Sequence, residues 1–282
     1  MIEKIAWVTD TAALLDEEFI KKNHIYEVPI VVIFEEGPYR EKVELKTSEF
    51  YDKLRAAKKL PTTSQPVFGE LVELYEQLKA DGYTCAIAVH PSSKLSNTLE
   101  SSAAAAKQVG FPIYAIDSKM ISYPMMKLLE EGIKLEKDGV FAADIVRHLE
   151  KMADQAVLCG IPSNLKQLHK SGRVPGIAAV IGNLIQLKLI LYFENGQVTL
   201  KEKVRTMKRA KEYVVSLLNE DLKNSKIPEV AIIHCNNQTD ALKWQLELQS
   251  QFPSISFVIY PLSPAIAVHA GEGTTGLSWM KI

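Results

Sequence analysis

Short runs of apolar, β-branched residues alternate with longer amphipathic stretches in the first part of the chain. The strand-like runs are residues 5–9, 26–34, 84–89 and 113–117, and the helix-like stretches are residues 48–58, 67–79 and 97–107. Parallel strands need long crossover connections, which are usually helices. The run 85–89 is apolar throughout, as expected for a strand that is covered on both faces. The alternation therefore predicts an α/β fold with a parallel sheet and helical crossovers.

A second α/β unit is predicted to follow. Residues 123–138 and 142–156 have helical periodicity and are separated by Gly139, and Asn195-Gly196 is a typical type I′ turn for a hairpin of residues 189–193 and 198–203. Further on, a helix (205–222), a strand (230–235), a helix (239–252) and a strand (255–260) alternate. At about 150 residues per domain, 282 residues favour two lobes. We expect them at residues 1–160 and 161–282, with the chain crossing between lobes more than once and a ligand tunnel between or within them.

Composition and short motifs exclude several classes of protein. The 33 basic and 34 acidic residues leave a net charge of −1, which gives no support to nucleic-acid binding. Three cysteines without a CxxC pair predict neither a disulfide framework nor a zinc site, and the histidines lack metal-ligand spacing. No signal-peptide or membrane-spanning run is present, so a cytoplasmic location is expected.

Two nucleotide-binding motifs are also excluded. Residues 271–276 match GxGxxG, but they precede a strand-like run (277–280) and so predict a tight turn beside the site. There is no GxxxxGK[ST] sequence to hold ATP. We therefore expect no metal and no cofactor, and a phosphoryl donor would have to come from a partner.

Polar residues gather where the predicted strands end. The clusters are Thr9-Asp10-Thr11, residues 62–66, residues 92–98 and Asp117-Ser118. In an open α/β sheet these loops meet in one crevice. Each cluster alone could be a helix N-cap, but hydroxyls and free N–H groups at helix starts also bind a carboxylate or phosphate. The excess of hydroxyls in the second and third clusters favours an anion site.

The chain resembles the DegV family in seven motifs that follow one another along nearly the whole sequence. They are Thr9-Asp10-Thr11, Thr63-Ser64-Gln65-Pro66, Ser92-Ser93-x-Leu95-Ser96-x-Thr98, Ile116-Asp117-Ser118, Lys170-Ser171-Gly172-Arg173, Lys203-Val204-Arg205-Thr206 and His269-x-Gly271-x-Gly273. The resemblance implies a two-lobed α/β protein that holds a long-chain fatty acid in a deep tunnel. It extends to the fatty-acid-binding subunit of bacterial fatty acid kinase, which presents the carboxylate to a separate ATP-binding subunit. The acyl phosphate then enters phospholipid synthesis.

Carried over position by position, the resemblance implies that Thr62 or Thr63, Ser93 and His269 hold the carboxylate. Thr63 is favoured because Ser64-Gln65-Pro66 follows it. Arg173 is implied to lie at the tunnel mouth, beside the carboxylate and the transferred phosphate, with Ser92 and Ser96 nearby. The chain departs from the family pattern at Asn97, Thr11 and Glu272, where Gly, Ser and Pro are common; Glu272 puts an acid near the proposed site.

The tunnel wall is expected to be apolar, since burial of each methylene contributes about 0.8 kcal/mol. Candidate wall residues, each of which could instead belong to the core, are Ile177, Val180, Ile181, Leu184, Ile185, Leu187, Met120, Met125 and Met126. The main alternative function is a serine-dependent acyl hydrolase or transferase in which His269 activates Ser93. Against it, the chain has no GxSxG motif and no evident third triad member.

A basic stretch follows the predicted hairpin. It comprises Lys201, Lys203, Arg205, Lys208, Arg209 and Lys211. Such a stretch is usually a solvated face, but it would also fit an acidic or phosphate-bearing partner. The expected partners are thus a long-chain fatty acid and a kinase subunit, with transient contact at a membrane surface as a further option.

Overall fold

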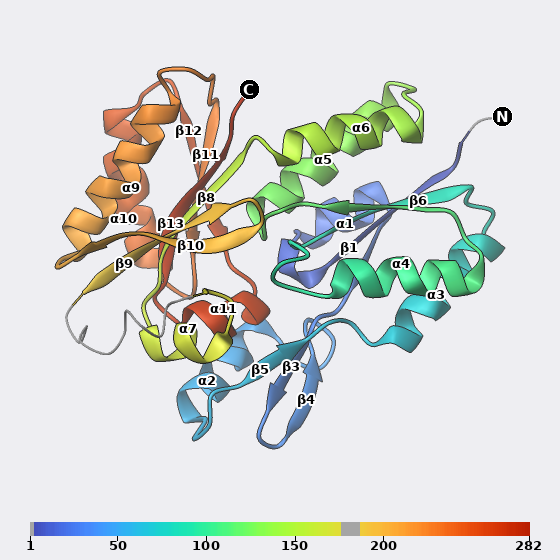
Figure 1. The fold of residues 1–282 in the computed structure, drawn as a ribbon, viewed down its shortest axis with the longest axis horizontal. Coiled ribbons are helices and arrows are strands. Elements are labelled where there is room, and N and C mark those ends of the chain that lie inside the picture. The colour runs from blue at the N-terminus through green and yellow to red at the C-terminus, as the bar shows by residue number, and fades with distance from the viewer. Residues whose placement is uncertain (1–2, 176–186) are drawn as a thin grey trace.

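A computed structural model describes residues 3–175 and 187–282. Their strands form three sheets: a parallel sheet of order β2-β1-β6-β7, a mixed sheet of order β10-β9-β8-β13-β11-β12 and a small antiparallel sheet of order β4-β3-β5. Figure 1 shows the two large sheets side by side with the small sheet below them. The chain is therefore an α/β protein with two main lobes and a small third sheet.

The parallel lobe is built on β1 (Ile5–Asp10), with helices on both faces. Its other strands are β2 (Ile25–Val28), β6 (Cys85–His90) and β7 (Ile113–Asp117), and its helices are η1 (Thr11–Ala13), α1 (Glu17–Asn23), α3 (Phe68–Ala80), α4 (Thr98–Val109), α5 (Tyr123–Lys137) and α6 (Ala142–Ala153). Ile5 and Trp7 pack on the side of α5 and α6, whereas Ala6 and Val8 pack on the side of α3 and α4. Strand alternation thus gives the sheet two hydrophobic faces, as the continuous apolar run of β6 predicts.

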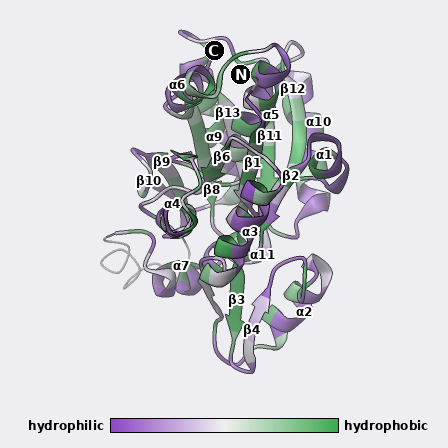
Figure 2. Cartoon of the chain, turned by 90° about the vertical axis from the view of Figure 1, so that its right-hand side faces the viewer, coloured by the Kyte–Doolittle hydropathy of each residue, from purple (hydrophilic) through white to green (hydrophobic). Residues whose placement is uncertain are grey.

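The mixed lobe contains most of the chain after α6. Its strands are β8 (Ala156–Ile161), β9 (Lys188–Glu194), β10 (Gln197–Val204), β11 (Glu229–His234), β12 (Ser256–Pro261) and β13 (Thr275–Met280), and its helices are α7 (Leu165–Ser171), α9 (Met207–Asp221), α10 (Gln238–Gln251) and α11 (Pro264–Ala270). One face of the sheet packs on α9 and α10, and the other turns inward to the rest of the molecule. Figure 2 shows mainly hydrophobic residues along the central strands and many hydrophilic residues along the outer helices.

The small sheet joins the two lobes. It consists of β3 (Val31–Phe34), β4 (Gly37–Arg40) and β5 (Thr62–Ser64), with α2 (Thr47–Ala56) packed against it. Val32 and Phe50 belong to the same hydrophobic cluster as Leu189 of the mixed lobe. The Tyr260 hydroxyl of β12 also donates to the Ala13 carbonyl oxygen at 2.6 Å. The inner face of the mixed sheet is therefore covered by elements from the N-terminal half.

Several sequence-based boundaries are confirmed. The β9–β10 hairpin turns at Asn195 and Gly196, both of which have positive φ. Gly139, also at positive φ, separates α5 from α6, and β13 follows the turn that contains Gly271 and Gly273. This turn precedes an antiparallel strand, so the GxGxxG match is not a dinucleotide fingerprint.

Other boundaries were wrong. Residues 26–34 form two strands in two sheets, because Pro29 lacks the N–H that would continue the ladder. Residues 62–64 are themselves a strand, not a loop at the end of one, and α6 ends at Ala153 so that β8 begins at Ala156. Residues 156–160 consequently pair within the mixed lobe. Helices α1, α7 and α11 and strand β4 were not predicted.

Among the described residues, no helix combines the length and the apolar character needed to cross a membrane.

Candidate functional site

A cavity of about 470 Å³ lies where the three sheets meet. Its volume falls within the range of about 300–1,000 Å³ that is typical of small-molecule sites. The mixed sheet supplies much of its apolar wall, through residues Leu158, Leu191, Phe193, Val198 and Ile233. Ala12 and Ile30 of the parallel lobe and Ala265 and Ile266 of α11 complete it. The cavity therefore lies in the interior between the lobes.

One part of the cavity wall is polar. Thr63 of β5, Ser93 and Ser96 of the loop after β6, Arg173 after α7 and His269 of α11 all line it. None of the described residues that line the cavity is acidic. The structure thus brings together five residues that the resemblance singled out from distant parts of the chain. Their hydroxyls and positive charge suit an anionic group.

Thr63 and His269 contact each other directly. Thr63 Oγ1 lies 2.9 Å from His269 Nε2. Burial, helped by the positive charge of Arg173, lowers the pKa of His269 to about 4, so the imidazole is neutral near neutral pH. With its proton on Nε2, the ring donates to Thr63 Oγ1 and leaves the Thr63 hydroxyl proton free for an anion in the cavity.

Ser93 is held by Asp117, which ends β7. The Ser93 hydroxyl donates to Asp117 Oδ2 at 2.6 Å, and the Ser93 amide lies 3.3 Å from the same oxygen. Asp117 also accepts from the Lys119 amide at 2.8 Å. In the described part of the chain, no hydrogen bond joins Ser93 to His269. The geometry therefore does not support a Ser93–His269 nucleophile pair.

Arg173 follows the C-cap of α7 and is exposed at the polar end. Its Nε donates to the Leu95 carbonyl oxygen at 3.1 Å and its Nη1 to the Ser171 carbonyl oxygen at 2.8 Å. No ion pair joins it to a carboxylate within the described residues. Its charge is thus available to a ligand, as the resemblance implies.

The other predicted polar residues differ in position. Ser96 lines the cavity, with its hydroxyl 2.8 Å from that of Thr98. Ser92 is fully buried outside the lining, and its hydroxyl donates to the Gly196 carbonyl oxygen at 2.6 Å. Gly196 has a φ of 80°, and an added Cβ would lie 2.7 Å from Ser92 Oγ. Ser92 therefore anchors the β9–β10 turn, and Thr62 lines only a smaller neighbouring cavity.

The late glycine motif lets the chain turn tightly after α11. Gly271 has a φ of 90°, and an added Cβ would lie 2.6 Å from Asn164 Cβ. Glu272 does not line the cavity; its Oε1 accepts from Arg55 Nη1 at 2.5 Å and from Asn236 Nδ2 at 2.6 Å. This departure from the family pattern therefore adds no acidic group to the cavity wall.

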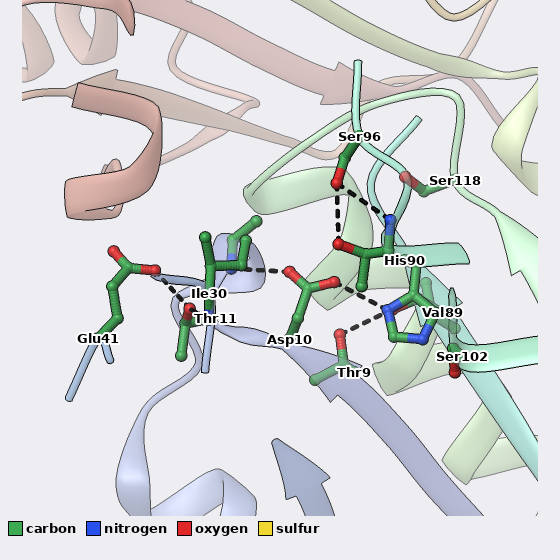
Figure 3. Close-up of polar contacts among 12 residues, drawn as sticks. Thr9, Asp10, Thr11, Ile30, Glu41, Val89, His90, Ser96, Ser102 and Ser118 are labelled. Carbon is green, nitrogen blue, oxygen red and sulfur yellow. Dashed lines mark hydrogen bonds and ion pairs between the residues drawn. The ribbon is translucent and has the colours of Figure 1, made fainter. Parts of the chain in front are cut away.

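The early cluster Thr9-Asp10-Thr11 is buried and does not line the cavity, and Figure 3 shows its polar contacts with Glu41 and His90. Asp10 accepts from the Ala12 amide at 3.0 Å and contacts His90 Nδ1 at 2.8 Å. The Thr11 hydroxyl bonds Glu41, whose other oxygen accepts from the Ala265 amide at 2.7 Å. Burial raises the pKa of Glu41 to about 8. These residues hold the wall residues Ala12 and Ala265 in place and do not face the ligand space themselves.

None of the predicted wall residues that the structure describes lines the cavity. Ile177, Val180, Ile181, Leu184 and Ile185 lie outside the described residues. Met120 and Met125 are buried in hydrophobic clusters, Met126 is partly buried beside them, and neither these methionines nor Leu187 line the cavity.

Sequence reasoning missed the wall residues of the mixed sheet and the role of Asp117. The alternation of β9 was a usable signal, because Leu191 and Phe193 share the inward face while Ile190 and Tyr192 face the outer cluster. Within the described residues, no group of three His, Cys, Asp or Glu side chains could hold a metal ion.

Comparisons with known proteins agree with this architecture. A family model described as "Uncharacterised protein, DegV family" matches residues 4–281. A DegV domain-containing protein of Halalkalibacterium halodurans is 37% identical over 277 residues, which cover 98% of each chain.

Two solved structures have the same fold. The crystal structure of DegV from Bacillus subtilis, described as a fatty acid binding protein, is 34% identical with a TM-score of 0.89, covering 99% of this chain and 100% of that one. A fatty acid binding DegV family protein from Streptococcus agalactiae is 28% identical with a TM-score of 0.91, covering 99% of each chain. The protein described here therefore belongs to the DegV family.

Proposed function

We propose that this chain binds a long-chain fatty acid, with the hydrocarbon in the apolar cavity and the carboxylate at its polar end. The observation that carries the proposal is a single cavity in which an apolar wall meets Thr63, Ser93, Arg173 and His269 without an acidic lining residue in the described part. The fatty acid binding described for the B. subtilis and S. agalactiae relatives supports it.

Each end of the ligand has a distinct source of affinity. The tail gains about 0.8 kcal/mol for each methylene removed from water. The head accepts hydrogen bonds from the Thr63 and Ser93 hydroxyls, and the guanidinium of Arg173 offsets its charge. His269 remains neutral and fixes the orientation of Thr63.

The same geometry favours presentation of the carboxylate to a separate kinase subunit. Arg173 is exposed, so the polar end is accessible, and this chain has no P-loop sequence to hold ATP. In the proposed step a carboxylate oxygen attacks the γ-phosphorus of ATP held by the partner. The bond from that phosphorus to the β,γ-bridging oxygen breaks, and ADP leaves with the electron pair. The product on this chain is an acyl phosphate.

An exposed basic surface on β10 and α9 is a candidate for docking that partner. Lys203, Arg205, Lys208 and Arg209 are exposed, and no ion pair joins them to a carboxylate in the described part of the chain. Reversing Lys208 and Arg209 to Glu should weaken binding of the kinase subunit at low salt and leave fatty acid binding unchanged. Surface plasmon resonance measures the first effect and calorimetry the second. Reversal of Lys21 and Lys22 on α1 is the control, and equal partner affinity in both double variants would remove the docking role.

The fatty acid itself can be tested directly. Native mass spectrometry before and after organic extraction should reveal stoichiometric fatty acid on the purified protein. After delipidation, Ser93→Ala should bind palmitate more weakly by roughly 1.5–3 kcal/mol, the range for a hydrogen bond to a charged group. Exposed Ser254→Ala serves as the control. An empty wild-type protein that also fails to take up palmitate or oleate would refute the proposal.

A substitution of Arg173 distinguishes fatty acid binding from presentation of the carboxylate to the kinase subunit. Arg173→Ala should reduce phosphoryl transfer by the kinase subunit more than it reduces palmitate affinity, because the largest negative charge develops during transfer. Equal losses in both would place Arg173 only in the carboxylate site.

A further inference from the structure

A second, smaller cavity of about 90 Å³ adjoins the polar end of the main one. Thr63, Ser171, Arg173 and His269 line both cavities. Six residues line only the small cavity: Thr62, Lys170, Leu60, Pro61, Gln167 and Val268. Because Lys170 and Thr62 are exposed, this cavity lies between the head of a bound fatty acid and solvent.

The charge around the two cavities exceeds that of a carboxylate. Lys170 and the shared Arg173 are the two cations of the small cavity, and exposed Lys94 lines only the main one, whereas none of the described residues lining either cavity is acidic. Lys170 Nζ donates one hydrogen bond, to the Leu60 carbonyl oxygen at 3.3 Å, which leaves two of its three N–H groups, and no ion pair holds it within the described residues. A carboxylate offsets one of these two charges. A phosphoryl group, at about −1.5 to −2, offsets both.

The donors of the small cavity also suit a phosphoryl group. Thr62 and Thr63 are successive residues of β5, so their side chains point to opposite faces of the strand. Thr63 reaches the main cavity, and Thr62 only the small one. The Gln167 amide and the Ser171 hydroxyl already donate to the Val268 and Leu168 carbonyl oxygens. Two N–H groups of Lys170, the hydroxyl of Thr62 and the second N–H of Gln167 therefore remain as donors for a ligand, together with the shared guanidinium of Arg173.

We propose that Lys170 and Thr62 form a subsite for the phosphoryl group of a fatty acyl phosphate whose acyl chain occupies the main cavity. This inference rests on the proposed fatty acid binding and extends it from the substrate to the product. The chain then binds the acyl phosphate more tightly than the fatty acid, and so retains the product after transfer.

The test compares a stable product analogue with the substrate. In 2-oxoheptadecylphosphonate a methylene replaces the labile bridging oxygen of palmitoyl phosphate. Calorimetry on the delipidated full chain should show the phosphonate binding at least about tenfold more tightly than palmitate, as expected for hydrogen bonds to a charged group. Lys170→Met should lose about tenfold in phosphonate affinity and change palmitate affinity less than about twofold. Thr62→Val should show the same selectivity with a smaller loss.

Lys166→Met is the matched control, because Lys166 is exposed on the same helix but lines neither cavity. Failure of millimolar inorganic phosphate to displace the phosphonate would confirm that the site takes a phosphoryl group attached to the acyl chain. Displacement would overturn this in favour of a free-phosphate site. If palmitate binds but the phosphonate binds no more tightly, or if Lys170→Met weakens both ligands equally, the subsite is refuted while fatty acid binding stands. If palmitate itself does not bind, the proposed function fails first.

Discussion

At the scale of single residues, Asp117 controls what Ser93 can offer to an anion. The Ser93 hydroxyl donates to Asp117 Oδ2 at 2.6 Å, so it must turn away from that carboxylate before it can donate to a bound fatty acid. The substitution Asp117→Asn removes a negative charge near the carboxylate of a bound fatty acid. The amide of the new asparagine can donate to Ser93 Oγ instead. Calorimetry should show palmitate affinity rising about fivefold, the value of one neutral hydrogen bond. Exposed Asp144→Asn is the control; weaker binding in D117N would show that Asp117 chiefly holds the Ser93 loop.

Buried His269 makes the free energy of unfolding depend on pH. Its pKa of about 4 in the folded chain lies below the ordinary 6.5, so between these values the unfolded chain binds a proton that the folded chain does not. Stability is therefore lost as the pH falls from 6.5 to 4, by about 3 kcal/mol for this group. Urea unfolding at several pH values should show a flatter profile for His269→Gln than for wild type, whereas exposed His148→Gln should keep the wild-type slope.

At the scale of elements, Glu41 joins three parts of the fold. It follows β4, bonds Thr11 of η1 and accepts from Ala265 at the start of α11. Its raised pKa means that the folded chain holds a proton between pH 4.5 and about 8 that the unfolded chain has released. Stability from this group therefore falls as the pH rises through that range, by on the order of 5 kcal/mol.

Glu41→Gln tests this pH dependence. A glutamine can donate to Thr11 and accept from Ala265 without a titrating proton. The unfolding free energy of Glu41→Gln should therefore vary less than that of wild type from pH 5 to pH 8. A variant whose profile parallels wild type would assign the slope to another group, such as the neighbouring Glu27, whose pKa is raised by burial.

Elements with a strong local pattern could be predicted from the sequence, and those defined by distant partners could not. The strand at 113–117 and the turn at Asn195-Gly196 can be recognised from their own residues alone. Strand β5 reads as a polar loop, because Thr62-Thr63-Ser64 pairs only with β3 and has no apolar periodicity of its own. The short helix α11 likewise depends on distant contacts. Glu41 accepts from the Ala265 amide at its start, and Thr63 contacts His269 near its end.

At the scale of the whole molecule, the ligand cavity needs all three sheets. Its wall combines Ala12 of the parallel lobe, Thr63 of the small sheet and Leu158 of the mixed lobe. A ligand should therefore stabilise both lobes together, by about 2.7 kcal/mol at one hundred times its dissociation constant.

Tryptophan fluorescence can follow each lobe separately. Trp7 lies in the parallel lobe, and Trp244 and Trp279 lie in the mixed lobe. In urea titrations of Trp7→Phe and of the double variant Trp244→Phe/Trp279→Phe, palmitate should shift both transitions. A shift confined to one lobe would place the ligand within that lobe alone.

The candidate site shows the same limit of sequence reasoning at this scale. Thr63, Ser93, Arg173 and His269 were singled out by resemblance, and the structure places all four around one cavity. The wall could not be predicted, because residues such as Leu158 and Ile233 have the same apolar character as core residues and differ only in what lies opposite them.

The contact between Thr63 and His269 spans 206 residues of sequence. A ribosome adding about 5–20 residues per second makes these two side chains roughly 10–40 s apart. Strand β13, in the middle of the mixed sheet, is made last of all. A nascent chain therefore exposes part of the apolar cavity wall before the proposed lipid site is complete. The proposed lipid site is complete only once β13 has been made, and until then the unfinished mixed sheet is the part of the chain most in need of a chaperone.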